Sequence, residues 1–148
     1  MGDEMTLREI TRDTLRDILQ LKVAPGQEQF VASNAVSIAQ AHFHPEVAWF
    51  RGIYAGDTPV GFVMLEDDQG ARSYSLWRFM IDAAHQGKGY GRRAIERVIE
   101  HVRTRPGATA LLTSVVRAEG GPGPFYEQLG FAYTGDILEG EHVMRRKL

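Results

Sequence analysis

The sequence predicts a mixed α/β domain in which a mixed sheet of six or seven strands carries helices on both faces. Ser73–Ile81 ends in side chains that are apolar on both faces, as in a central, covered strand. A helix-like segment and a second apolar strand, Ala110–Val116, follow it. Such a strand–helix–strand passage implies a parallel pair with a right-handed crossover. Short turns join most of the other strands, which indicates antiparallel hairpins.

Composition limits the class of protein. The 148 residues suit one domain, 1–148, and a net charge of −2 argues against general nucleic-acid binding. Cysteine is absent, which excludes disulfides, thiolate zinc sites and a cysteine nucleophile. No apolar run is long enough to cross a membrane, and the first residues lack the basic and apolar regions of a signal peptide. We therefore expect a cytoplasmic protein without nucleic-acid or membrane partners.

The first half of the chain is expected to contain four strands and two helices. The expected elements are a strand Met5–Ile10, a short helix near residues 15–21, a helix Gln27–His42, and strands Ala48–Ala55, Val60–Asp67 and Ser73–Ile81. The longer helix should bury Ile38 and Ala39 on its apolar side. The polar Asn34 and Ser37 should lie off that side. The helix should end before Pro45, because the residue before a proline resists helical geometry.

Regular alternation of side chains gives the last of these strands two apolar faces. Trp77, Phe79 and Ile81 should share one face. Leu76 and Met80 should share the other. Both faces of the strand therefore need a covering layer.

The second half of the chain supplies the crossover and a closing hairpin. The expected elements are a helix from Gly89 to about Arg105, a strand Ala110–Val116, a short helix Phe125–Leu129, and strands Phe131–Leu138 and His142–Lys147. The apolar stripe of the crossover helix consists of Ala94, Ile95, Val98, Ile99 and Val102. Pro124 and Gly130 occupy favoured positions near the start and after the end of the short helix.

Three glycines, Gly87, Gly89 and Gly91, stand at the mouth of the crossover helix. A helix start leaves main-chain amides without partners and carries the positive end of the helix dipole. Glycine lacks a Cβ, so a ligand can approach its main chain closely. The pattern favours a phosphate-bearing ligand; a mobile turn tightened by glycine is the alternative.

Two nucleotide-binding patterns can be set aside. Gly89–Ala94 fits G-x-G-x-x-G/A, but a dinucleotide-binding domain needs several strand–helix–strand units and only one surrounds this match. The P-loop pattern G-x-x-x-x-G-K-[ST] does not occur in the sequence. Arg92 and Arg93 stand where its lysine and hydroxyl would have to be.

Gln86–Gly91 resembles the Q/R-x-x-G-x-G/A signature of the GNAT superfamily of acetyl-CoA-dependent N-acetyltransferases. Phe125–Phe131, FYEQLGF, resembles the second signature of that family, and the element order matches over nearly the whole chain. Stretches such as QFVASNAVSIAQA and HQGKGYGRRAIE are similar to bacterial diamine and polyamine (spermine/spermidine) acetyltransferases. The resemblance implies a GNAT-like fold with a splayed central parallel strand pair, and acetyl-CoA as co-substrate. It is also compatible with a homodimer.

The chain departs from the family at one point. Many members have Asn followed by Ala seven residues before the tyrosine of the second signature. Here that position is Glu119, and Gly-Gly-Pro-Gly-Pro fills the interval. The resemblance therefore says less about this side of the cofactor cleft than about the glycine loop.

The resemblance implies where acetyl-CoA binds. The pantetheine arm would lie between the splayed strands, with a main-chain N–H near Met80 or Ile81 on the thioester carbonyl. The pyrophosphate would sit on the amides of residues 86–91. Lys88 and Arg92 either reach phosphate oxygens or are solvated residues at a helix end. The expected cofactor-binding residues are Phe79, Met80, Ile81, Gln86, Gly87, Lys88, Gly89, Tyr90, Gly91, Arg92 and Tyr126.

Tyr126 is the expected general acid, because the resemblance places a tyrosine near the thioester sulfur. A phenol titrates near ~10 and a thiol near ~8.5, so complete proton transfer to a thiolate is uphill by roughly 2 kcal/mol. Either the site lowers the pKa of Tyr126 or a hydrogen bond does most of the work. A packed tyrosine that anchors the short helix is the structural alternative.

The acceptor is expected to be a primary amine of a small polycation, a polyamine or diamine. An amine titrating near ~10.4 is neutral in about one molecule in a thousand at neutral pH, so its deprotonation matters. Glu66, Asp82 or Glu119 could assist, and the sequence does not choose among them. Glu28, Glu66 and Glu119 are the candidates for binding a cationic acceptor, although exposed acidic residues are ordinary.

Several alternatives stay open at the level of sequence. The acceptor could be an aminoglycoside, an amino acid or a protein amine. A non-catalytic acetyl-CoA-binding module would keep the glycine loop without turnover, and Tyr126 favours catalysis over it. His42 and His44 suggest a metal site, but no third ligand is in view, so no metal is expected.

Overall fold

The computed structural model describes residues 4–148, and residues 1–3 of the expected domain and of its N-terminal segment lie outside the described part. The elements in order are β1 (Met5–Arg8), α1 (Leu15–Gln20), α2 (Asn34–His42), β2 (Ala48–Ala55), β3 (Thr58–Asp68), β4 (Ser73–Ile81), a 3₁₀ turn η1 (Ala83–His85), α3 (Tyr90–Arg103), β5 (Ala110–Val115), α4 (Gly123–Gln128), β6 (Ala132–Leu138) and β7 (Glu141–Lys147). The strands form one seven-stranded sheet of order β1-β2-β3-β4-β5-β7-β6. The predicted mixed α/β class is confirmed.

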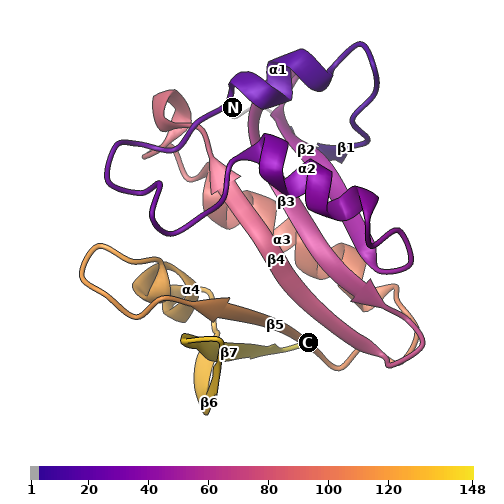
Figure 1. Ribbon diagram of the computed structural model, residues 1–148, viewed down its shortest axis with the longest axis vertical. Coiled ribbons are helices and arrows are strands. Elements are labelled where there is room, and N and C mark those ends of the chain that lie inside the picture. The colour runs from indigo at the N-terminus through magenta and orange to yellow at the C-terminus, as the bar shows by residue number, and fades with distance from the viewer. Residues whose placement is uncertain (1–3) are drawn as a thin grey trace.

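Helices cover both faces of the sheet. Figure 1 shows α1 and α2 in front of β2–β4 and α3 behind them. On the first face Ile18 and Ala41 pack with strand side chains such as Phe62. On the second face the apolar stripe of α3 is buried at all five predicted positions, against residues such as Leu65 and Leu111. Burial of these apolar side chains fixes α1, α2 and α3 to the sheet.

Helix α2 begins seven residues later than predicted, at Asn34 rather than Gln27. Ser33 caps it, because the Ser33 hydroxyl accepts a hydrogen bond from the Val36 amide at 3.2 Å. The residues before it form turns, and residues 21–33 contain no helix or strand.

The prediction that Asn34 and Ser37 lie off the buried side of α2 is wrong. Asn34 is 4% exposed and Ser37 is fully buried, whereas Val36 is 48% exposed. Asn34 Nδ2 donates to the Ile18 carbonyl at 2.9 Å, and Ser37 Oγ donates to the Ser33 carbonyl at 3.0 Å. Burial of a polar group is tolerated when it is hydrogen-bonded, and this overrides the polarity pattern.

A β-bulge in β4 overturns the predicted alternation of its side chains. Arg78 is paired with Met64 and Leu76 with Leu65, which leaves Trp77 as the extra residue. Leu76 consequently packs in the same cluster as Ile81, on the α3 side. Trp77 packs on the opposite side, in the α1–α2 cluster. Beyond the bulge the regular alternation resumes.

The parallel pair of β4 and β5 is held together over a very short length. Only Ser75 with Leu112 and Leu76 with Thr113 are in register. The Thr113 hydroxyl adds a hydrogen bond to the Leu76 carbonyl at 3.3 Å. Past this junction the strands separate, and Figure 1 shows β5 running at an angle to β4. The expected splayed central pair is confirmed.

Candidate active site

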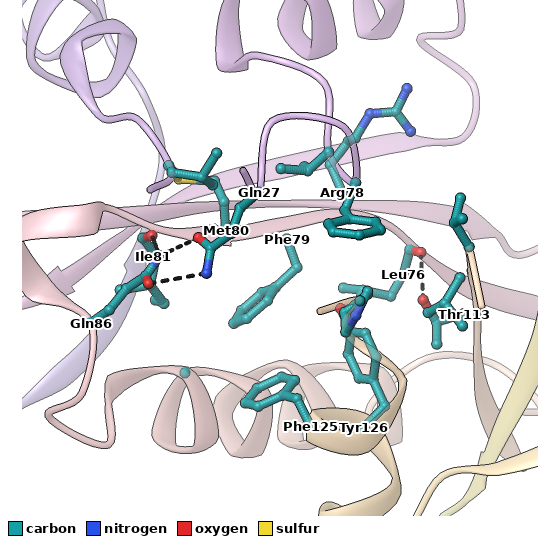
Figure 2. A pocket seen from close by; sticks show the side chains of 18 of the residues that line it. Gln27, Leu76, Arg78, Phe79, Met80, Ile81, Gln86, Thr113, Phe125 and Tyr126 are labelled. Carbon is teal, nitrogen blue, oxygen red and sulfur yellow. Dashed lines mark hydrogen bonds between the residues drawn. The ribbon is translucent and has the colours of Figure 1, made fainter. Parts of the chain in front are cut away.

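A cavity of about 690 Å³ lies where β4 and β5 separate. Its walls come from five segments: the connection between α1 and α2, the end of β4, the glycine loop with the first turn of α3, the end of β5, and the region around α4. Figure 2 shows Phe79 pointing into this space toward Phe125, beside Tyr126. A concave site of this size holds a ligand of cofactor dimensions.

The glycine loop presents open main-chain amides to one end of the cavity. Gly87 and Gly89 both have φ of +79°, in the left-handed region that favours glycine. Gly89 is the N-cap of α3 and makes no side-chain capping bond. The Arg93 amide donates to the Gly89 carbonyl at 3.3 Å, and the amides that precede it at the start of the helix have no partner within the helix. Unpaired amides at the positive end of a 14-residue helix suit an anion such as a diphosphate.

Close packing inside the protein favours glycine at position 91. A Cβ at this position would lie 3.2 Å from two ring carbons of Phe125 and 3.8 Å from Ile81. Phe125 in turn stacks on Phe79 at a centroid distance of 6.0 Å. The absence of a side chain at Gly91 therefore lets α4 close against α3 and β4, in addition to any room it gives a phosphate.

The direction of the main-chain groups along β4 limits which N–H could bind the thioester carbonyl of the cofactor. The Asp82 amide donates to Val60 of β3 at 2.8 Å. Successive residues of a strand face opposite edges, so the main chain of Met80 also faces β3. The N–H groups of Phe79 and Ile81 face the other edge, toward the cavity. A donor near Met80 or Ile81 is therefore supplied by Ile81 or Phe79.

The side chains of Gln27 and Gln86 join two walls of the cavity (Figure 2). Gln86 Nε2 donates to Gln27 Oε1 at 2.8 Å and to the Ile81 carbonyl at 2.9 Å. Gln27 Nε2 donates back to Gln86 Oε1 at 3.3 Å. The side chain of Gln86 is thus engaged with protein, and its main chain leads into the glycine loop.

Tyr126 lies in α4 with its ring buried. The ring makes edge contacts with Phe125 and Phe131, at centroid distances of 5.1 and 5.3 Å. Burial raises the pKa of Tyr126 above its usual value, and a hydrogen bond with the Thr113 side chain opposes that shift only in part. The site therefore does not lower the pKa of this phenol, and Tyr126 keeps its proton.

Opposite charges share the lining of the cavity. Glu28 and Glu141 are the carboxylates among the described lining residues, and Arg78 lies near Glu141. The Ser114 hydroxyl donates to Glu141 at 3.3 Å. Burial lowers the pKa of Arg78, an effect that the nearby Glu141 opposes. Arg78 also donates to Gln40 of α2 at 2.9 Å.

A model of the Acetyltransferase (GNAT) family matches residues 9–131. The chain belongs to the acetyltransferase (GNAT) family. It is therefore an acetyl-CoA-dependent N-acetyltransferase, and acetyl-CoA is its co-substrate. The cavity and the open amides at the start of α3 fit such a ligand.

Relatives and solved structures agree with this family. The chain is 28% identical to spermine/spermidine N(1)-acetyltransferase of Bacillus subtilis (strain 168), over 97% of this chain and 99% of that protein. An acetyltransferase from Thermus thermophilus has the same fold, with a TM-score of 0.76, 21% identity and full coverage of both chains. Spermidine N-acetyltransferase from Vibrio cholerae, crystallised with CoA and spermine, gives a TM-score of 0.73 at 22% identity, over 97% and 94% of the chains.

The acetyltransferase brings most of the residues predicted for the cofactor to one cavity. Of that set, Lys88 is exposed and does not line the cavity, while the others do. Glu28 lines the cavity as expected of an acceptor residue. Glu66 and Glu119 are exposed and lie outside the lining. Asp82 is also outside it, and its carboxylate accepts main-chain amides of residues 22 and 84 at 2.8 and 3.2 Å.

The polar lining residues of the acetyltransferase that sequence reasoning missed include these four: Gln27, Arg78, Thr113 and Glu141. Three of them lie in segments expected to be regular helix or strand, and Glu141 was assigned to a turn. Their partners are distant in the chain, as with Gln27 and Gln86, 59 residues apart. No local pattern could have paired them.

The departure at Glu119 has a structural counterpart in the acetyltransferase. Gly120, Gly121 and Pro122 line the cavity in place of a side chain. Gly120 has φ of +77°, and the Gly121 amide donates to the Ala118 carbonyl at 3.0 Å. A Cβ at Gly121 would lie 2.9 Å from that same carbonyl, so the turn requires glycine here. Main chain therefore forms this wall.

Neither a metal site nor a membrane span is found in the part of the acetyltransferase that the structure describes. No group of three or more His, Asp or Glu side chains there could hold a metal ion. No helix between residues 4 and 148 is long and apolar enough to cross a membrane. His44 lies against Trp77 instead, at a centroid distance of 5.8 Å.

Proposed function

We propose that this acetyltransferase acetylates a primary amine of a small polycation, a polyamine or diamine, with Tyr126 as general acid. The observation that carries the proposal is a single cavity with open amides at one end and two carboxylates, Glu28 and Glu141, in its lining. The spermine/spermidine acetyltransferase of Bacillus subtilis, similar over nearly its whole length, supports the choice of acceptor.

The cofactor end would act through main-chain groups. The amides of residues 87–92 bind the pyrophosphate, and the N–H of Ile81 or Phe79 binds the thioester carbonyl oxygen. Loss of one such donor to a developing negative charge costs about 3–4 kcal/mol of transition-state stabilisation. Phe79 and Phe125 form an apolar wall that keeps water from the pantetheine arm.

Acetyl-CoA supplies the acetyl group as a thioester, and a nitrogen–carbon bond forms as the carbon–sulfur bond breaks. The amine loses one proton and the departing sulfur gains one. Tyr126 holds a proton beside the sulfur, and its raised pKa means that it acts chiefly by donating a hydrogen bond. The thiolate leaves while it accepts this hydrogen bond and is then protonated from water, which also takes up the proton that the amine loses.

The amine end would select for positive charge. Glu28 and Glu141 each attract an ammonium group of the acceptor that is not being acetylated. Arg78 lies beside Glu141 and limits how much positive charge this part of the cavity accepts. An acceptor with two or more separated amines therefore fits better than one that carries a carboxylate.

Free thiol released from acetyl-CoA, followed over time with a panel of amines, tests the proposal. The panel contains spermine, spermidine, putrescine, an aminoglycoside and several amino acids. We expect fastest release with the polyamines. Thiol release only with the aminoglycoside or with amino acids would mean that these compounds, and not polyamines, are the acceptors. Tight CoA binding without release by any amine would favour a non-catalytic module.

A further inference from the structure

We infer that Gln27 and Gln86 are positioning residues that couple the cofactor loop to the amine wall of the cavity. The inference rests on the proposed function, because it assigns the cavity side near Glu28 to the acceptor. The inference goes beyond the proposed function because it names the residues that hold that side in place. The pair joins two segments that no strand pairing or helix connects.

The hydrogen bonds of this pair form a continuous chain across the cavity wall. Gln86 Nε2 bridges the Ile81 carbonyl and Gln27 Oε1, at 2.9 and 2.8 Å. Gln27 Oε1 also accepts the Ala24 amide at 3.1 Å. Both amide groups are partly buried, which protects these bonds from competition with water. The carbonyl end of β4 is thereby tied to the connection between α1 and α2.

A second attachment secures the same connection five residues earlier. The Lys22 amide donates to Asp82 at 2.8 Å, and the Lys22 carbonyl accepts the Ala83 amide at 2.8 Å. Residues 22–27 are thus fastened at both ends to residues 81–86. The following residues, 28–32, line the cavity without being part of a helix or strand. The position of residues 28–32 therefore depends on the hydrogen bonds that Gln27 makes.

The location of Gln86 links the fastening to the cofactor. Gln86 is the residue at which the glycine loop begins, and the open amides follow it directly. A ligand bound on those amides fixes the main chain of Gln86 and so favours one orientation of its side chain. Through Gln27 this orders residues 28–32. By thermodynamic linkage, an acceptor bound on that wall strengthens CoA binding by the same factor.

Hydrogen exchange with and without CoA tests the coupling without requiring an acceptor. In the unaltered protein, saturating CoA should slow amide exchange in residues 23–32 as well as in 86–92. In Gln27→Ala the slowing should persist in 86–92 and be lost in 23–32. Gln20→Ala, which removes an exposed glutamine of α1 outside the cavity, should behave like the unaltered protein. Equal slowing of 23–32 in Gln27→Ala would overturn the inference.

Kinetics with spermine supply a second readout that loss of stability alone would not move. Gln27→Ala should raise the KM for spermine by about 5-fold or more, the usual lower range of coupling between sites, with a smaller change in the KM for acetyl-CoA. Gln27→Glu keeps an acceptor for Gln86 and Ala24 but loses the 3.3 Å bond to Gln86 Oε1, so it should restore part of the spermine KM. Equal impairment in Gln27→Glu and Gln27→Ala would contradict the role.

The two layers of the proposal can be told apart. If CoA does not slow exchange in residues 86–92 of the unaltered protein, the proposed cofactor loop is wrong and the coupling falls with it. If CoA protects 86–92 but never 23–32, the cofactor loop stands and only the coupling through Gln27 is wrong.

Discussion

The two ends of the cavity are built from different parts of the chain. At the proposed cofactor end, main-chain amides of residues 87–92 and the edge of β4 would face the ligand, and glycines set their geometry. At the amine end, the ligand would meet side chains: Glu28, Glu141 and Arg78. Every residue offers the same main-chain groups, so the first end tolerates most substitutions other than those of its glycines. The second end changes with each side chain, which allows acceptors to differ while the cofactor stays the same.

The largest effect should follow from a substitution that distorts the main chain of the cofactor end. Gly89→Val places a β-branched residue at φ of +79°, which is strained even in open space. We expect CoA affinity to fall by about 100-fold, equivalent to roughly 2.7 kcal/mol, measured by calorimetric titration.

Gly135→Val is the matched control for that strain. Gly135 has φ of +94°, a Cβ added to it would meet no atom within 4 Å, and it lies in β6 outside the cavity. It should lose a similar amount of stability and retain CoA affinity. Equal loss of affinity in both variants would mean that Gly89 acts only through folding.

Tyr126→Phe tests the proposed role of Tyr126 as general acid. The turnover number should fall by about 100-fold, the lower range for general acid catalysis, while CoA affinity stays nearly constant. Steady-state kinetics and titration together measure the two quantities. Proportionate losses in both would reduce Tyr126 to a packing role.

The pH dependence of turnover tests the same role of Tyr126. Turnover at low amine concentration should rise with pH toward about 10, because the neutral amine becomes more abundant. A general acid is lost as pH rises through its pKa, and burial raises the pKa of Tyr126, so its loss moves above the usual phenol range. A descending limb between about pH 9 and 10 that disappears in Tyr126→Phe would contradict the raised pKa.

Smaller effects are expected from the side chains of the amine end. Glu28→Gln and Glu141→Gln should each raise the KM for spermine about 2- to 5-fold, because partly exposed charge pairs contribute up to ~1 kcal/mol. The KM for acetyl-CoA should not change. Glu139→Gln, in the exposed turn before β7, is the control. A rise in the KM for both substrates would contradict the assignment of Glu28 and Glu141 to amine binding alone.

The smallest effect belongs to a region that touches neither end. His101 of α3 stacks on Trp49 at 4.2 Å, and its pKa is lowered, first by burial and then by Arg105, against the opposing effect of Asp67. The unfolded chain therefore binds the proton more readily below about pH 6.5, and folding stability decreases as pH falls through that value. In His101→Gln, thermal unfolding between pH 7 and 5 should depend less on pH, with turnover unchanged. An unaltered pH dependence would show that His101 does not titrate on unfolding.

The sequence allowed most elements and the glycine turn at the start of α3 to be predicted, because both depend on local patterns. The bounds of Ala48–Ala55 and Ser73–Ile81 were predicted correctly from apolar runs between turns. The bulge at Trp77 was missed because it arises from register with β3, which no local pattern records. The start of α2 was missed because turns precede Ser33, which caps the helix. The burial of Asn34 was missed because its partner is a carbonyl of α1, 16 residues away.

The junction between β4 and β5 has a consequence for how the molecule admits ligands. Two residue pairs and the Thr113 hydroxyl join the half of the sheet that leads into the glycine loop to the half formed by β5, β7 and β6. The buried core around α3 spans both halves, so they form one unit although main-chain pairing nearly stops at this junction. The cavity therefore opens between two strands of a single sheet while the core on the α3 side stays continuous.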